Sequence, residues 1–229
     1  MVILIFIAFI VACFTVDAIV RYSRKNKSRI SALVSDSLNV FNENSVTIPK
    51  GIYFDKSHTW AFMEKNGFVK IGIDDFFLHI TGPLSRLIMK NQGDKIQKGE
   101  AILTIVQNGK QLIINAPISG TVKSRNIQLE ADPSILNLSP YNDGWFYTIE
   151  PSDWLRDTQF LFMADKYKEW LKNEFARLKD FLAINIQTRN AEFVPVMLQD
   201  GGELKDNVLE DFGPEVWEEF QIKFINTSK

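Results

Sequence analysis

The most strongly apolar part of the chain is its beginning. Residues 2–20 read VILIFIAFIVACFTVDAIV and carry a single charge, Asp17. Nineteen helical residues at about 1.5 Å each span roughly 28 Å, close to the ~30 Å hydrocarbon core of a bilayer. A helix also satisfies its own backbone hydrogen bonds, which lipid requires. The pattern therefore predicts a transmembrane helix over residues 1–20.

A cluster of basic residues follows this run directly. Only the α-amino group precedes the run, and Lys and Arg are enriched on the cytoplasmic flank of membrane helices. We therefore expect a single-pass anchor in the inner (cytoplasmic) membrane, with residues 2–20 in lipid and the rest of the chain in the cytoplasm. A cleaved signal peptide is the alternative, but it carries its basic region before the apolar core. Residues 21–50 form a basic juxtamembrane linker, whose cluster is Arg21, Arg24, Lys25, Lys27 and Arg29.

Between residues 51 and 153 the apolar positions come in short runs separated by Gly, Pro, Asn and Asp. Such runs are typical of strands. The strongest turn signal is Asn108-Gly109, because a type I′ hairpin turn needs positive φ at both central residues. The segment is therefore predicted to be a small, mainly β domain. The expected strands cover residues 52–54, 59–63, 68–73, 101–106, 111–114, 120–123 and 145–149.

The period of the apolar positions changes after Pro151. Between residues 165 and 183 large apolar side chains recur every three or four positions, with Lys and Glu on the other face, which predicts an amphipathic helical segment within residues 154–183. We interpret the apolar stripe as packing on the β domain. The alternative is that it docks a partner or lies on the membrane surface. The stripe consists of Tyr167, Trp170, Leu171, Phe175, Leu178, Phe181 and Leu182.

Residues 184–229 are expected to form an acidic C-terminal tail. Residues 192–220 hold nine acidic residues against one Lys, together with large apolar residues such as Trp217 and Phe220. Gly pairs and Gly-Pro break the segment into pieces. Two interpretations are open. The tail docks on another surface, in which case Trp170, Trp217 and Phe220 are candidate docking residues, or it folds back on its own domain.

Composition excludes several functional classes. The chain has 229 residues, 45% hydrophobic and 24% charged, with a formal net charge of -2. This lack of a basic excess predicts no nucleic-acid partner. Cys13 is the only cysteine, so no intrachain disulfide is possible. His58 and His79 are the only histidines, and no His or Cys pair has metal-ligand spacing. We therefore expect no metal site, no catalytic residues and no enzyme.

Several motifs together resemble the H protein of the glycine cleavage system. They are His58-Thr59-Trp60, FVKIGIDDF over residues 68–76, Gly82-Pro83, GDKIQKGE over residues 93–100, APISGTV over residues 116–122, DPSILN over residues 132–137, Pro140-Tyr141 and Gly144-Trp145. The resemblance covers about residues 52–153. It implies a flattened β-barrel of the lipoyl/biotinyl type over residues 51–153. Within it, His58 is interpreted as a packing and hydrogen-bonding residue, and Asp74-Asp75 as a turn at a strand end.

The resemblance also implies a lipoyl group on a lysine at a hairpin tip. In the family this lysine stands seven residues before the Ala of the Ala-Pro-x-Ser-Gly motif, and counting back from Ala116 gives Gly109. The family tip reads roughly Glu-Ser-Val-Lys, and none of Val106, Gln107, Asn108 and Gly109 agrees with it. The hairpin tip of this chain therefore lacks the acylated lysine that the family uses.

Lys110, one residue further along, has three readings. It is a solvated hairpin lysine, a displaced lipoyl-attachment site, or a contact to an acidic partner. Side chains alternate across a strand, so a shift of one residue turns the lysine to another face, which favours the first reading. We therefore expect a membrane-anchored, non-lipoylated module that binds or assembles a protein partner in a membrane-associated complex, without cofactor. The alternative is a lipoyl carrier with lipoate on Lys110, serving a membrane-bound redox or one-carbon enzyme.

Overall fold

The structure, a computed structural model, describes residues 40–188 and 204–226. The chain divides into two units near Val40, and the description below concerns the residues from Val40 onward. The predicted transmembrane helix and the basic cluster from Arg21 to Arg29 lie outside the described residues. Within the part that is described, no helix has both the length and the apolar character needed to cross a membrane.

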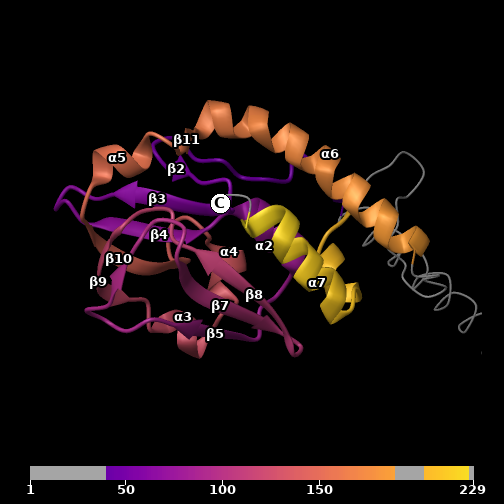
Figure 1. The fold of residues 1–229 in the computed structure, drawn as a ribbon, viewed down its shortest axis with the longest axis horizontal. Helices are drawn as coiled ribbons and strands as arrows, with labels where there is room; N and C mark the ends of the chain where they lie inside the picture. Colours follow the sequence, from indigo (N-terminus) through magenta and orange to yellow (C-terminus); the bar gives the residue numbers. More distant parts are fainter. Residues whose placement is uncertain (1–39, 189–203, 227–229) are drawn as a thin grey trace, which may run out of the picture. The chain divides into compact units, whose positions relative to one another are not determined.

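The larger sheet has seven antiparallel strands in the order β11-β2-β3-β4-β10-β9-β6. The predicted strands at residues 59–63, 68–73, 120–123 and 145–149 all fall in it, with small shifts at their ends (Figure 1). The strands are β2 (Tyr53–Phe54), β3 (Thr59–Met63), β4 (Val69–Ile73), β6 (Lys95–Ile96), β9 (Gly120–Arg125), β10 (Trp145–Pro151) and β11 (Phe162–Met163).

A second sheet contains the predicted hairpin. It has three antiparallel strands in the order β5-β7-β8: β5 (Arg86–Met89), β7 (Ala101–Gln107) and β8 (Lys110–Asn115). Leu87, Ile105 and Leu112 lie opposite one another across it and are buried, whereas Ile88 and Ile113 in the neighbouring row are exposed. This alternation fixes the register, because a slip of one residue would turn the buried row to solvent.

The expected flattened barrel is not closed, which corrects the prediction. Among the described strands, β5 pairs only with β7 and β6 only with β9, so no ladder of hydrogen bonds joins the two sheets. Side chains from both sheets contribute to one hydrophobic core instead, among them Ile71, Ile105 and Ile149. Burial of the inner faces therefore holds the sheets together where backbone pairing does not.

Helix α2 (Asp75–Thr81) stands where the sequence suggested a strand-end turn. Asp74 is its N-cap, and the Asp74 carboxylate accepts a hydrogen bond of 2.8 Å from the Phe77 backbone N–H. An Asp in this position satisfies one of the free N–H groups of the first turn. Phe76, Phe77 and Ile80 are fully buried, so the helix forms part of the core. Two further short helices, α3 (Gln128–Ala131) and α4 (Ile135–Leu138), were not predicted either.

The helical segment after Pro151 is confirmed, in two parts: α5 (Trp154–Thr158) and the long α6 (Ala164–Thr188). The apolar stripe of α6 is buried on its own domain, as expected, and Trp170 packs half-buried against the same core. Figure 1 shows α6 running along one side of the domain, next to β11 and β2. The stripe is therefore not free for a partner or a membrane surface in this structure.

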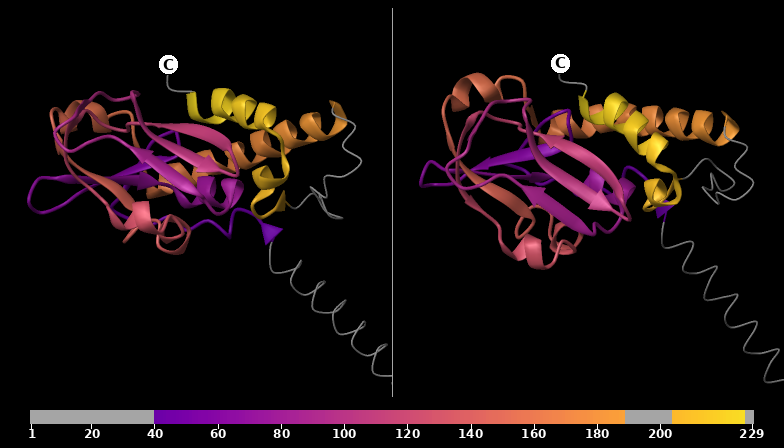
Figure 2. Two further views of the ribbon diagram at one scale, coloured as in Figure 1. Left: turned by 90° about the horizontal axis from the view of Figure 1, so that it is seen from below. Right: turned by 60° about the horizontal axis from the view of Figure 1, so that its bottom comes forward.

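The described part of the acidic tail folds back on the domain. It comprises β12 (Leu204–Lys205), which pairs with β1 (Val40–Phe41), then η1 (Val208–Asp211), α7 (Pro214–Phe220) and the π-helix η2 (Gln221–Ile225). Two views in Figure 2 place α7 beside α6, and the Phe181 ring contacts the rings of Phe220 and Phe224. Trp217 is 1% and Phe220 0% exposed. The docking role considered for these two residues is therefore corrected, because packing in the core hides them.

Candidate functional site

The hairpin apex between β7 and β8 has the geometry predicted from Asn108-Gly109. Gln107 pairs with Lys110, and φ is 49° at Asn108 and 82° at Gly109. Both values are positive, as a type I′ turn requires. The Asn108 backbone N–H donates to the Ser85 hydroxyl at 3.2 Å. Glycine at the second turn position offers no side chain to which a group could be attached.

Gln107 anchors the base of the apex to helix α2. Its side chain is 1% exposed, and its amide N–H donates to the Thr81 carbonyl at 2.7 Å. A buried hydrogen bond of this kind fixes the orientation of the amide, because leaving either group unpaired would cost about 1–3 kcal/mol. The apex is therefore tied to the body of the domain.

Lys110 is held by the C-terminal segment of its own chain. Its ammonium donates hydrogen bonds to the carbonyls of Glu210 (2.6 Å) and Phe212 (3.2 Å), and it lies 4.9 Å from the centre of the Trp217 ring. Burial lowers the pKa of Lys110, although Glu210 and Asp211 nearby favour its charged form. The preferred reading of a freely solvated lysine is thus wrong. The third reading had Lys110 contact an acidic partner. In the structure, the acidic C-terminal segment of the same chain makes this contact.

Gln221 closes the free edge of the three-stranded sheet. β8 is an edge strand, and both backbone groups of Ile113 point outward to the Gln221 side chain. The Ile113 N–H donates to the amide oxygen at 2.6 Å, and the amide N–H donates to the Ile113 carbonyl at 2.9 Å. One side chain thus makes the pair of hydrogen bonds that a neighbouring strand would make, which protects an edge that would otherwise attract other chains.

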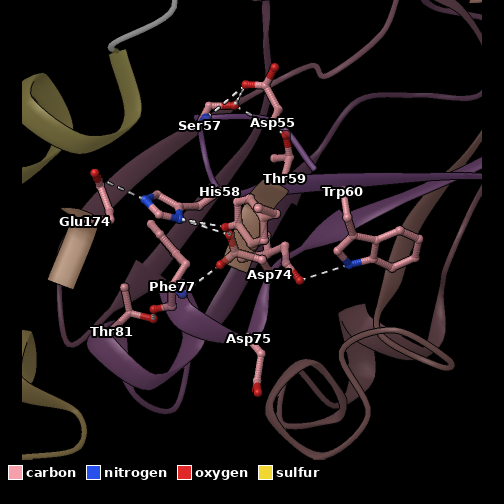
Figure 3. A network of polar contacts seen from close by, with 12 residues as sticks. Asp55, Ser57, His58, Thr59, Trp60, Asp74, Asp75, Phe77, Thr81 and Glu174 are labelled. Atoms are coloured by element: carbon pink, nitrogen blue, oxygen red, sulfur yellow. Dashed lines mark hydrogen bonds and ion pairs between the residues drawn. The ribbon is translucent and has the colours of Figure 1, made fainter. Parts of the chain in front are cut away.

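A buried polar cluster joins the start of α2 to α6, and Figure 3 shows its His58 between Asp74 and Glu174. His58 Nδ1 lies 2.9 Å from the Asp74 carboxylate, and the Tyr167 hydroxyl donates to the same carboxylate. On its other side, His58 Nε2 lies 3.6 Å from Glu174 Oε1. All four side chains are at most 1% exposed. The cluster therefore joins the β2–β3 loop, the N-cap of α2 and helix α6.

The charge state of His58 follows from these partners. Burial alone would lower its pKa, but Asp74 and then Glu174 outweigh burial and raise the pKa to about 9. His58 is thus protonated at neutral pH and forms ion pairs with both carboxylates. This agrees with the interpretation of His58 as a packing and hydrogen-bonding residue. Because the cluster is sealed from solvent, it offers no atom to a substrate.

His79 makes a second link between α2 and the C-terminal segment. Its Nδ1 lies 2.7 Å from Asp206, and its Nε2 lies 3.7 Å from Asp75. Burial opposes protonation of His79, but Asp206 and Asp75 raise its pKa above the usual value. Within residues 40–188 and 204–226, no group of three or more His, Cys, Asp or Glu is arranged to hold a metal ion.

Comparison with known proteins identifies the class of domain. The fold matches the crystal structure of a glycine cleavage system H protein from Mycobacterium marinum, with a TM-score of 0.50 and 22% sequence identity over 55% of this chain and 99% of that one. The family model described as glycine cleavage H-protein matches residues 52–174. The chain therefore belongs to the glycine cleavage H-protein family.

Individual relatives cover the same region. The glycine cleavage system H protein of Thermus thermophilus is 32% identical over 127 residues, which are 56% of this chain and 98% of that protein. The H protein of Psychrobacter cryohalolentis is 33% identical over 124 residues, 54% of this chain and 98% of that protein. The family match ends at Glu174, inside α6, so the C-terminal segment that holds Lys110 lies beyond it.

Sequence reasoning missed the partners of the predicted residues. Tyr167 and Glu174 lie seven positions apart on α6, on the face that packs against the domain, and a Glu within an apolar stripe was the available signal for a buried ion pair. Gln221 gave no signal, because its role depends on which strand is at the edge. The basic residues Arg21, Arg24, Lys25, Lys27 and Arg29 lie outside the described residues.

Proposed function

We propose that this chain is a membrane-anchored H-protein-like domain that acts without lipoate, as a binding and assembly module for a membrane-associated complex. One observation carries the proposal. The hairpin apex presents Gly109, and the nearest amine, on Lys110, is already bound by the carbonyls of Glu210 and Phe212 and by the Trp217 ring. The glycine at the apex and the bound state of Lys110 together argue against a lipoyl group at this hairpin, which a carrier would need.

The surroundings of Lys110 do not fit an acyl group. Acylation would turn the ammonium, which can donate three hydrogen bonds, into a neutral amide that donates one. The amide could meet only one of the two carbonyls, and the contact between a cation and the Trp217 ring would be lost. We therefore assign no lipoyl chemistry to this site.

The anchor supports the assembly role. Residues 2–20 and the basic cluster after them support a single-pass protein of the inner membrane with its domain in the cytoplasm. Tethering a domain to the membrane raises its effective concentration toward other membrane proteins, so a modest direct affinity is sufficient. The partner is a protein of such a complex.

The assembly role is tested on native gels. The full chain, solubilised from its own membranes in mild detergent, is expected to migrate in a complex larger than itself. A variant without residues 2–20 should fold but lose that complex. Migration of the full chain alone, whatever the detergent, would refute the proposal.

A further inference from the structure

A cleft of about 690 Å³ lies between the β2–β3 loop, the β6–β7 loop, the β8–β9 connection and helix α5. α5 is at the far end of the domain from α7, as Figures 1 and 2 both show, so the cleft is separate from the hairpin apex. Its walls include Asp55, Lys98, Ser119, Arg156, Asp157 and Phe160. Lys98 and Ser119 belong to motifs of the family resemblance, but the sequence assigned no binding role to any of the six.

The two carboxylates of the cleft are buried and already hydrogen-bonded at both oxygens. Asp55 is 6% exposed and accepts from the Ser57 N–H (2.9 Å) and from the Lys98 ammonium (3.1 Å). Asp157 is 2% exposed and accepts from the Ser119 N–H (2.6 Å) and from Arg156 Nε (3.0 Å). Although burial raises it, the pKa of Asp157 is held below its usual value by these two donors. The carboxylates therefore act as fixed anions that orient the cations.

The cations keep donors for a further partner. The Lys98 ammonium uses two of its three N–H groups among the described residues, on Asp55 and on the Pro117 carbonyl. Arg156 is 58% exposed and has five N–H donors. Its Nε serves Asp157 and lies 3.8 Å from the exposed Asp153 carboxylate, and one terminal nitrogen lies 3.4 Å from the Ser119 hydroxyl. With Lys56 also in the wall, the cleft has one more positive than negative charge.

The rim adds an apolar contact. Phe160 lines the cleft and is 66% exposed, so its ring is accessible to a ligand in the cleft. A planar guanidinium favours a carboxylate, which it can bind through two parallel hydrogen bonds. A ligand with carboxylates and a neighbouring apolar side chain would satisfy both features.

From this arrangement we propose that the cleft between Lys98 and Arg156 receives an acidic segment of a partner protein, with Asp or Glu side chains at the two cations and an apolar side chain on Phe160. This rests on the proposed function as a binding module and adds the class of partner. Charge complementarity selects the occupant, because three cations in the wall, Lys56, Lys98 and Arg156, outnumber its two paired carboxylates. The exposed Asp153 carboxylate lies beside Arg156 but is not part of the wall.

The test uses the full chain in a non-ionic detergent and two fluorescent peptides. The acidic probe is Glu-Phe-Glu-Glu-Leu-Glu, and the neutral probe has Gln in place of each Glu. We expect saturable binding of the acidic probe, binding at least about tenfold weaker for the neutral probe, and weakening with salt, since the contact is partly exposed. Equal binding of the two probes, or no binding of the acidic probe, would overturn the proposal.

Variants locate the contact. Arg156→Gln is expected to weaken the acidic probe about fivefold, Arg156→Lys less, and Phe160→Ser about fivefold, since both side chains are exposed and the fold should persist. Lys123→Gln is the matched control, because Lys123 is a comparably exposed lysine paired with Glu150 outside the cleft. A loss as large for Lys123→Gln as for Arg156→Gln would show non-specific attraction instead.

Competition with free glutamate decides between a protein segment and a small anion as the occupant of the cleft. Complete competition at the same carboxylate concentration would make the cleft a small-anion site and overturn the partner assignment. The peptide experiment does not depend on lipoylation or on the native complex. Its failure would therefore leave the proposed function standing, whereas loss of the native complex would not change the peptide result.

Discussion

His58 shows how a buried cation depends on partners that are distant in the sequence. Asp74 is 16 positions away, and Tyr167 and Glu174 come from helix α6. Because the folded-state pKa of about 9 lies above the ordinary value of 6.5, protonated His58 stabilises the fold fully below pH 6.5. This stabilisation is lost progressively as the pH rises from about 6.5 to about 9.

This gives a prediction for stability against pH. The free energy of unfolding should fall by about 3 kcal/mol between pH 6 and pH 9 because of His58. Urea unfolding at several pH values measures it. The variant His58→Gln should be less stable at pH 6 and show a much smaller fall, the remainder coming from His79, whose pKa is also raised. An equal slope in the variant would contradict the assignment.

At the same scale, the sequence located several key residues but not their environment. The His-x-Trp motif pointed to His58, and Asn108-Gly109 correctly predicted the turn. The sequence marks Lys110 as the critical amine but gives the wrong state for it, because the carbonyls that bind it belong to Glu210 and Phe212, about a hundred positions later. Contacts of this range are set by the packing of the whole domain, which local patterns do not encode.

At the scale of elements, α7 and η2 complete the three-stranded sheet at its β8 edge. The Gln221 amide replaces the missing strand at Ile113. Most of the longer strands were predicted, because alternation of buried and exposed positions is a local signal. Strand β5 was missed. Helix α2 was missed, since its seven residues are nearly all buried and show no amphipathic period. The sequence does not decide where the tail lies, because burial of the tail depends on a surface that is formed by residues far from it in the sequence.

Removing the Gln221 side chain from the β8 edge gives a second prediction. Gln221→Ala should lower the free energy of unfolding by about 1–2 kcal/mol, because both backbone groups of Ile113 lose their partner. Hydrogen exchange at the Ile113 amide should speed up about tenfold or more. Gln159→Ala, at an exposed position after α5, is the control and should change neither quantity. Unchanged exchange at Ile113 in Gln221→Ala would show that the amide does not close the edge.

The packing of Trp217 gives a third prediction. Trp217→Ala should lower the free energy of unfolding by about 3–5 kcal/mol, since the ring is 1% exposed and its removal leaves a cavity. The same change removes the ring next to the Lys110 ammonium. Phe62→Ala, at a partly exposed position of β3, should cost much less. Thermal and urea unfolding measure both, and similar losses would contradict the packing described here.

At the scale of the whole molecule, the chain combines a predicted membrane anchor with an H-protein-family domain that carries its own C-terminal segment. The anchor prediction implies that the full chain stays in the membrane pellet after alkaline carbonate extraction, because the apolar run of residues 2–20 is long enough to span the hydrocarbon core as a helix. Deletion of residues 2–20 should move the protein to the supernatant. Release of the full chain by carbonate would mean that the segment does not span the bilayer.

The central claim, that the hairpin apex is not an acylation site, is tested most directly by the intact mass of the native chain purified from its own membranes. A sample of a genuine H protein from the same cells serves as the control for active lipoylation. We predict a mass without any lipoyl increment for this chain, while the control is modified. A lipoyl increment that peptide analysis maps to Lys110 would contradict this claim and establish a carrier instead.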